Sequence, residues 1–427
     1  MIRTKSVTPT RSSDVQTVHV QEDARERATF EEDYKAAAQG VRAAMTELLA
    51  SAGLGASNSR ELSRRLGLNK NLAWKVARIV NESDPYSAAQ HIPGSAGVDL
   101  MLSALKRAGA SPSAIENARA AMRSFERIVE VHTGDRATLE QMLGNLASRP
   151  TRAEHLLMSR KQAYQGNSGI YGVRAKAQIA ANVLSPSTTP GMVDIMQIGG
   201  VVGFRRLRHD ARWLLFRRGS FTDDGSLSQP ADGEAIDPRR EHGIPLMTDF
   251  CSSPIPQLEL IRTAHEAQYE LPPGPVGNTA STNLIYGVIM RETATMYRDE
   301  HDQYAVLFCG VSAPSELVQH DLIVHEDFAW AMPPEPLLLN RLDGSAVHLT
   351  SGRDRNLLPF TETVQELGRG VSRMASTHFP WYTRLLTDAF ARVGFNADEF
   401  VGFRLTIPYP PIPSLVMLRA PLPERRS

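Results

Sequence analysis

The chain contains few of the residues that build covalent or metal-bound scaffolds. Only two of its 427 residues are cysteines, Cys251 and Cys309. Two thiols alone do not complete the four-ligand site of a structural zinc ion, and they do not suggest a disulfide framework. A reducing compartment is the simpler environment for such a chain, so we expect a cytoplasmic protein.

Long apolar stretches are also absent. No run approaches the roughly 20 apolar residues that a membrane-spanning helix needs. The N-terminal sequence MIRTKSVTPTRSSDV lacks the apolar core of a signal peptide. A hydrophobic fraction of 42% and a charged fraction of 22% are typical of a globular protein, so the composition predicts a soluble chain.

Lysine is absent after Lys176, although the formal net charge of the whole chain is zero. Residues 151–220 carry eleven basic and three acidic residues, whereas residues 221–350 carry six basic and twenty acidic residues. A solvated surface explains the acidic residues without any further role. The division predicts that only the basic N-terminal half contacts nucleic acid.

No motif in the sequence predicts a reaction. The GxSxG elbow is absent, and the glycine-containing loop at 165–169 lacks the GxxxxGK[ST] order of a phosphate-binding loop. Cys309 lies in the apolar run YAVLFCGV, the usual setting of a buried and unreactive thiol. His320 and His325 have no identifiable third partner, so side chains of a half-buried strand are favoured over a metal site. We therefore predict no catalytic residue, no cofactor and no metal.

The length of the chain predicts two or three domains. The expected order is a disordered arm over 1–27, a helix-turn-helix domain over 28–90, a helical module over 91–185 and an α+β domain over 186–427. Helical spacing of apolar residues predicts helices over about 29–52, 96–109, 112–131 and 136–148, and again on both sides of GNSGIYG within 151–183.

From about residue 192 the pattern changes to short β-rich runs bounded by Gly, Pro, Asn or Asp. These runs are MVDIMQIGGVVGF, ARWLLFRR, NLIYGVIMRE, YAVLFCGV, LIVHEDFAW, EFVGFRLTI and LVMLRAPL. Helices are predicted between them near 256–268, 314–319 and 361–393. Strands and helices mixed in this way predict an α+β domain with a mostly antiparallel sheet.

The most informative stretch is Ser57–Val80, which is typical of two short helices joined by a tight turn. Asn58 and Glu61 fit a capping box at the start of the first helix, and Asn69 fits the N-cap of the second. Gly67 stands where the first helix must end with a left-handed residue. Apolar residues at helical spacing let the two helices share one core: Leu62, Leu66, Leu68, Ala73 and Val76.

This stretch resembles a helix-turn-helix DNA-binding unit. Its apolar residues, the small residue Ser63 and the glycine Gly67 stand where that family has them, whereas Ala73 replaces a larger β-branched residue. The resemblance covers about 20 of the 427 residues. The alternative is an ordinary corner between two packed helices. Six basic residues against one acidic residue in the stretch favour DNA binding.

The resemblance implies a DNA-binding protein, a transcriptional regulator of bacterial type whose recognition helix over about 70–80 enters the major groove of double-stranded DNA. Arg60, Arg64 and Arg65 would then grip the DNA backbone. The residues facing the DNA would be Lys70, Asn71, Trp74, Lys75 and Arg78, with Asn71 pairing with adenine and Lys75 or Arg78 with guanine or phosphate.

Helix-turn-helix proteins commonly bind two half-sites as dimers, so the resemblance also implies a homodimer. The C-terminal domain would sense a small-molecule effector, recruit a protein partner or hold the dimer together. Two other classes stay open. One is an enzyme of unknown reaction whose residues converge only in the folded C-terminal domain, and the other is a structural or assembly protein.

Overall fold

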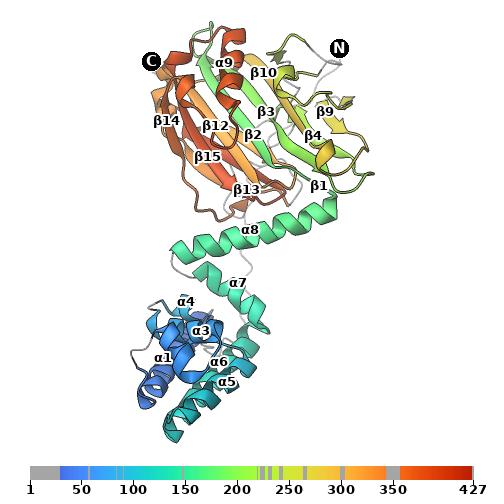
Figure 1. Cartoon of the computed structure of the whole chain (residues 1–427). Coiled ribbons are helices and arrows are strands. Elements are labelled where there is room, and N and C mark those ends of the chain that lie inside the picture. The colour runs from blue at the N-terminus through green and yellow to red at the C-terminus, as the bar shows by residue number, and fades with distance from the viewer. Residues whose placement is uncertain are drawn as a thin grey trace, which may run out of the picture. The chain divides into compact units, whose positions relative to one another are not determined.

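A computed structural model of the chain describes residues 29–55, 58–82, 84–89, 91–146, 149–218, 220–221, 227–228, 233–239, 244–262, 267–298, 303–342 and 356–425. The chain divides into two compact units, Met1–Ser148 and Arg149–Ser427, here called unit 1 and unit 2 (Figure 1). The predicted arm over 1–27 lies outside the described residues.

Unit 1 is all-helical in its described residues. Its helices are α1 (Phe30–Ser51), α2 (Ser59–Leu66), α3 (Lys70–Asn81), α4 (Pro85–Ala89), α5 (Ser95–Arg107), α6 (Pro112–Ile128) and α7 (Arg136–Leu146), and a short π-helical segment, Val129–Thr133, follows α6. The helices predicted over 29–52, 96–109, 112–131 and 136–148 are confirmed as α1, α5, α6 and α7. Buried apolar side chains from Tyr34 in α1 to Leu143 in α7 form one cluster. The predicted boundary at residue 90 thus falls inside a single core.

Capping residues explain where helices α1 and α6 begin. The Thr29 hydroxyl and the Glu32 carboxylate form a complete capping box at the start of α1. The Ser111 hydroxyl accepts a hydrogen bond from the Ala114 amide at 3.2 Å, and Pro112 follows at the first position of α6. These caps satisfy amide groups that have no partner inside the helix.

Unit 2 begins with helix α8 (Arg149–Tyr171) and continues as an α+β fold. Its strands are β1 (Val173–Arg174), β2 (Ala177–Pro186), β3 (Met192–Arg206), β4 (Trp213–Arg218), β5 (Ser220–Phe221), β6 (Leu227–Ser228), β7 (Glu234–Ala235), β8 (Glu259–Arg262), β9 (Ala267–Leu271), β10 (Thr282–Thr295), β11 (Tyr304–Val311), β12 (Leu317–His325), β13 (Glu335–Asn340), β14 (Gln365–Arg369), β15 (Phe400–Pro408) and β16 (Ser414–Pro421), with helix α9 (Tyr382–Val393) before β15. Short 3₁₀ turns cover Thr248–Phe250, Asn278–Ala280, Glu326–Ala331, Val371–Arg373 and Ala397–Glu399.

The main sheet has eight strands in the order β14-β15-β12-β2-β3-β10-β7, with β1 paired to β3. Only β12 and β2 pair in parallel among its named strands; the other pairs are antiparallel, which confirms a mostly antiparallel α+β architecture. Helix α9 lies across one face of this sheet (Figure 1) and shares a core with it. The smaller sheet β11-β16-β13 packs on the other face and encloses a second core.

Three predicted helices are wrong. Residues 173–184, predicted to resume the helix after GNSGIYG, form β1 and most of β2. Residues 256–268 contain β8 and the start of β9, and residues 314–319 lead into β12. Of the helix predicted over 361–393, α9 forms only the last part, and β14 and the 3₁₀ turn Val371–Arg373 precede it. Strand β2 is buried on both faces, so its sequence has no polar alternation, and its alanines imitate a helical core. The predicted boundary at 185 therefore falls at the end of a central strand, and the basic stretch 151–220 belongs to unit 2.

Candidate nucleic-acid interface

Three residues set where α2 begins, where it ends and where α3 begins. The Asn58 side chain accepts hydrogen bonds from the amides of Arg60 and Glu61 at 3.1 and 3.0 Å. Gly67 ends α2 with φ of 64°, a left-handed conformation that costs glycine little. The Asn69 side chain then accepts from the Leu72 amide at 2.8 Å and starts α3. Both predicted N-caps are confirmed. The Glu61 side chain, predicted to complete a capping box, instead lies 3.7 Å from the Arg65 guanidinium in an ion pair.

The inward faces of α2 and α3 share one core with α1. Leu62 and Leu66 of α2 are buried, as are Leu72, Ala73, Val76 and Ile79 of α3. All of them belong to the same cluster as the inward face of α1, so the pair shares its core with α1. The hydroxyl of Ser63 donates to the Leu68 carbonyl at 2.7 Å, which ties α2 to the turn. A small residue at position 63 allows this close contact.

The predicted site residues lie on the outward faces of the two helices. Arg60, Arg64, Arg65, Lys70, Asn71, Trp74 and Arg78 are exposed, and Lys75 is half-buried. Lys70, Trp74 and Arg78 are spaced by four residues and form one stripe along α3, with Asn71 and Lys75 beside it. We call these eight residues the α2–α3 surface.

Two arginines of this surface already have partners. Arg65 donates to the Gly53 carbonyl at 3.2 Å, which ties α2 to the end of α1. Arg78 is 3.3 Å from Glu82 in an ion pair one helical turn away. The Arg65 and Arg78 side chains are both exposed, and an exposed ion pair such as Arg78–Glu82 is worth about 1 kcal/mol or less. Neither partner therefore prevents the guanidinium from reaching a phosphate.

His91 joins this surface from outside α2 and α3. Its ring meets the Trp74 ring edge-on, with centroids 4.8 Å apart, and the Arg78 guanidinium lies 5.6 Å from the Trp74 centroid. Burial lowers the pKa of His91, and the Arg78 charge lowers it further because a second nearby cation disfavours the imidazolium. The sequence offers no signal for this contact, since His91 lies in a Pro-, Gly- and Ser-rich connector.

The start of α5 borders the same surface. An open hollow of about 190 Å³ separates α3 from this segment, and its lining comprises Asn69, Asn71, Leu72, Lys75, Pro93, Gly94, Gly97 and Leu100. Gly97 makes room for Pro93 at the start of α5, because a Cβ at Gly97 would lie 2.9 Å from the Pro93 Cβ. Residues 93–100 thus border the side of α3 that carries Asn71 and Lys75.

The histidines that the sequence singled out in unit 2 do not converge. His320 is fully buried, and its Nε2 lies 2.9 Å from the side-chain nitrogen of Asn182. His325, the last residue of β12, instead has its Nε2 3.2 Å from the Glu399 carboxylate. Among the described residues, no group of three or more His, Cys, Asp or Glu side chains is placed to hold a metal ion. Burial raises the pKa of the Cys309 thiol to about 12, which fits the predicted buried thiol.

His320 should make the stability of unit 2 depend on pH. Burial lowers its pKa to about 4 from the usual 6.5, so the unfolded chain binds the extra proton between these values. Its contribution to the free energy of unfolding is therefore complete above pH 6.5 and falls by about 3 kcal/mol as the pH drops to 4. Denaturant unfolding from pH 7 to 4 should show a shallower decline in a His320→Leu/Asn182→Leu variant. Parallel curves for the two proteins would contradict this.

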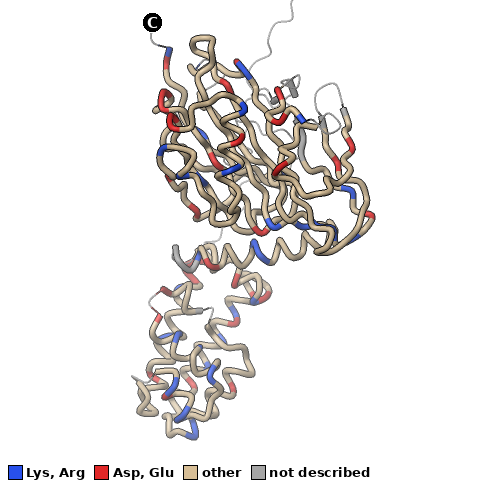
Figure 2. The backbone as a smooth tube through the Cα atoms, turned by 45° about the horizontal axis from the view of Figure 1, so that its top comes forward, with Lys and Arg blue, Asp and Glu red and all other residues tan. Residues whose placement is uncertain are grey.

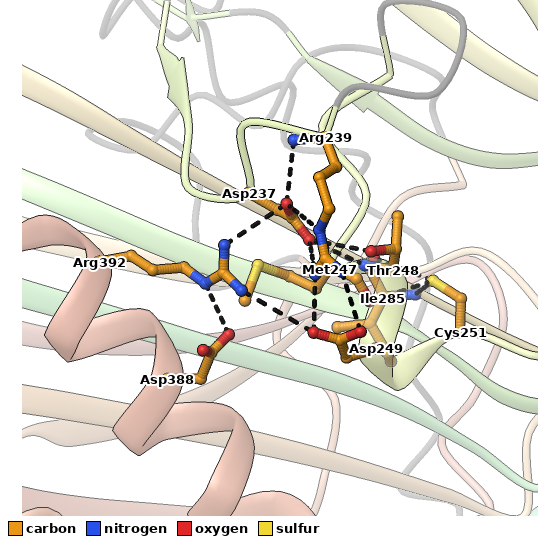
Figure 3. Close-up of polar contacts among 9 residues, drawn as sticks. All are labelled: Asp237, Arg239, Met247, Thr248, Asp249, Cys251, Ile285, Asp388 and Arg392. Carbon is orange, nitrogen blue, oxygen red and sulfur yellow. Dashed lines mark hydrogen bonds and ion pairs between the residues drawn. The ribbon is translucent and has the colours of Figure 1, made fainter.

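A second polar cluster ties the edge loops of the main sheet to α9 (Figure 3). The buried Asp237 carboxylate accepts from Nε and Nη2 of Arg239 at 3.0 and 2.8 Å and from the Thr248 hydroxyl at 3.0 Å. Burial opposes ionisation, but these bonds outweigh it and hold the pKa of Asp237 well below its usual range. Arg392 of α9 reaches both Asp237 and Asp249. The carboxylates drawn here all have cationic partners, so the cluster stabilises the fold.

No protein-family model, curated protein or solved structure matches this chain. None of the described helices combines the length and the apolar character needed to span a bilayer. A functional proposal therefore depends on the α2–α3 surface, which combines positive charge, solvent exposure and two capped helices.

Proposed function

We propose that the chain binds double-stranded DNA through the α2–α3 surface and acts as a transcriptional regulator. One observation carries the proposal. The apolar residues of α2 and α3 are buried in a core with α1, while the basic and polar residues between them are turned to solvent on one side. A capped pair of short helices that presents cations in this way is suited to place α3 in a major groove.

The positions on α3 suggest separate roles. Asn71 lies at the N-terminal end of α3, where side chains of a recognition helix reach base edges, and it matches the donor and acceptor of adenine. Lys70 beside it and Arg78 further along α3 would contact phosphates. Arg60 and Arg64 on α2 would contact phosphates and fix the register. Trp74, which is 41% exposed and packed on His91, would offer an apolar contact to the groove.

In this proposal the protein is a cytoplasmic homodimer, and unit 2 senses an effector or a partner. A dimer would place two α3 helices on successive major-groove faces, about one helical turn of DNA apart. The test is selection of bound sequences from a random duplex library by the full chain. An enriched motif with two related half-sites supports the proposal, and an unenriched pool contradicts sequence reading.

A Lys70→Ala/Arg78→Ala variant should bind the selected duplex at least about tenfold more weakly than the unmodified chain. The slope of log affinity against log salt should become shallower by about 2, because each cation that contacts a phosphate releases about one counterion. Fluorescence anisotropy over a salt series measures both quantities. Both side chains are exposed, so thermal unfolding should change little.

The matched control is Arg119→Ala/Arg123→Ala, which removes two charges from α6 in the same unit. It should leave affinity and slope nearly unchanged. An equal loss in both variants would mean that net charge, rather than the α2–α3 surface, governs binding.

A further inference from the structure

Strands β1 and β3 place two arginines directly opposite each other. Their antiparallel register pairs Val173 with Arg206 and Arg174 with Arg205. Side chains directly opposite in such a pair start about 5 Å apart, and like charges at that distance repel. A cross-strand Arg–Arg pair is therefore unfavourable unless an anion joins it.

A third cation shares the face of this pair. Along β1 and the chain that follows it, Val173 and Ala175 are buried, whereas Arg174 is half-exposed and Lys176 is exposed. The alternation of strand side chains thus puts Arg174 and Lys176 on the outward face. Gly203 has φ of 63° and makes room for Lys176, because a Cβ at Gly203 would lie 2.8 Å from the Lys176 Cβ. Figure 2 shows Lys and Arg positions in this region, where α8 meets the end of the sheet.

The two arginines are poorly satisfied by the protein itself. Within the part of the chain that the structure describes, Nε of Arg174 and Nε of Arg205 are buried and have no hydrogen-bond partner. Arg205 donates through Nη1 to the Asn278 side chain, a neutral group. A buried donor without a partner costs free energy, so neither guanidinium is fully satisfied by the protein.

Neighbouring arginines are treated differently. Arg208 is paired with Asp210 at 2.7 Å, and Arg212 with Glu259 and Glu270. The buried Arg206 donates to the carbonyls of Ala211 and Pro272. Carboxylates or carbonyls thus satisfy these three arginines, which sets the Arg174–Arg205 pair apart.

Glu316 is an acidic residue that lies near the pair. Glu316 accepts a hydrogen bond from the Tyr164 hydroxyl at 3.2 Å. Burial and Glu316 raise the pKa of Tyr164, while Arg174 and Arg205 lower it, because both guanidinium groups lie close to the phenol. Lys161 of α8 stands nearby over the Tyr409 ring, which in turn contacts Tyr164. The cluster keeps a positive excess after Glu316 is counted.

We propose that Arg174 and Arg205, assisted by Lys176, bind a phosphate group on the outward face of β1 and β3. Two guanidinium forks offer parallel N–H donors that match phosphate oxygens, and Lys176 supplies a further charge. The bound anion would cancel the repulsion between the arginines. This site lies in unit 2 and is independent of the α2–α3 surface.

The test titrates inorganic phosphate into the full chain by isothermal calorimetry, with sodium chloride keeping the ionic strength constant. We expect saturable binding to the unmodified protein and at least about tenfold weaker binding to Arg174→Gln, because charge-assisted bonds are lost. Arg174→Lys keeps the charge without the fork and should retain part of the affinity. The control Arg212→Gln removes an arginine that is already ion-paired, and it should bind phosphate normally.

A second arm distinguishes free phosphate from a nucleic-acid backbone. It measures duplex binding by Arg174→Gln in a chain that also carries Lys70→Ala/Arg78→Ala. A further loss of duplex affinity assigns the phosphate group to DNA, and phosphate binding without such a loss assigns it to a small molecule. Equal phosphate binding by the unmodified chain and Arg174→Gln, with no effect on the duplex, overturns the proposal. Failure of sequence-specific DNA binding would leave the phosphate titration unchanged, so the two proposals fail separately.

Discussion

Replacing Arg404 by methionine is expected to lower the free energy of unfolding of unit 2 by about 3–5 kcal/mol. The Asp321 carboxylate is fully buried on β12, and Arg404 of β15 holds it through two bonds, Nε to Oδ1 at 2.9 Å and Nη2 to Oδ2 at 2.7 Å. The Tyr382 hydroxyl of α9 donates a third bond at 2.7 Å. Methionine would fill the space but leave a buried carboxylate without its cation.

Chemical denaturation followed by circular dichroism and hydrogen exchange in β12 measures this loss. Arg369→Met is the matched control, because Arg369 lies on the edge strand β14 and forms an exposed ion pair with Glu326. That change should cost about 1 kcal/mol or less. Asp321→Leu/Arg404→Met should be more stable than Arg404→Met, since it removes the orphaned charge. If Arg404→Met costs no more than Arg369→Met, the pair does not stabilise the sheet.

Truncating Leu66 to alanine should lower the free energy of unfolding of unit 1 by about 2–5 kcal/mol. Leu66 is 6% exposed and packs at the end of α2 in the core shared with α1 and α3. The change removes apolar contacts and leaves a cavity where the two helices meet. In the proposed function it would also weaken DNA binding, because α3 would lose its support.

Helical circular dichroism during denaturant titration reports the loss in unit 1. Leu100→Ala is the control, since Leu100 of α5 is 60% exposed and its truncation should change stability by about 0.5 kcal/mol or less. The measurement would contradict the packing of α2 against α1 if the two variants were equally stable. Loss of DNA binding by Leu66→Ala without loss of stability would instead point to a direct contact.

The local features of the candidate site could be predicted from the sequence. Asn58, Gly67 and Asn69 act on amides or backbone angles within a few residues, so their roles as caps and helix end were visible in the chain. The same holds for the outward α2–α3 surface, because exposure on a helix follows the spacing of its apolar residues. Strands such as β11 and β16 were recognisable from β-rich runs between turn residues.

Central strands and sheet pairing were not predictable in this way. Strand β2 looked helical because both of its faces are buried, and burial on two faces removes the alternation that marks a strand. Its parallel pairing with β12 joins residues more than a hundred positions apart, as Ala181 and Asp321 show. No local pattern encodes such a contact.

The sequence by itself determined the caps, the helix ends and the polar face of α3, because these depend on short-range hydrogen bonds and on helical periodicity. Only the tertiary structure decided that His91 joins that face, that Asp321 meets Arg404, and that Arg174 stands opposite Arg205. Each of these contacts depends on packing between separate elements, which the linear order of residues does not reveal.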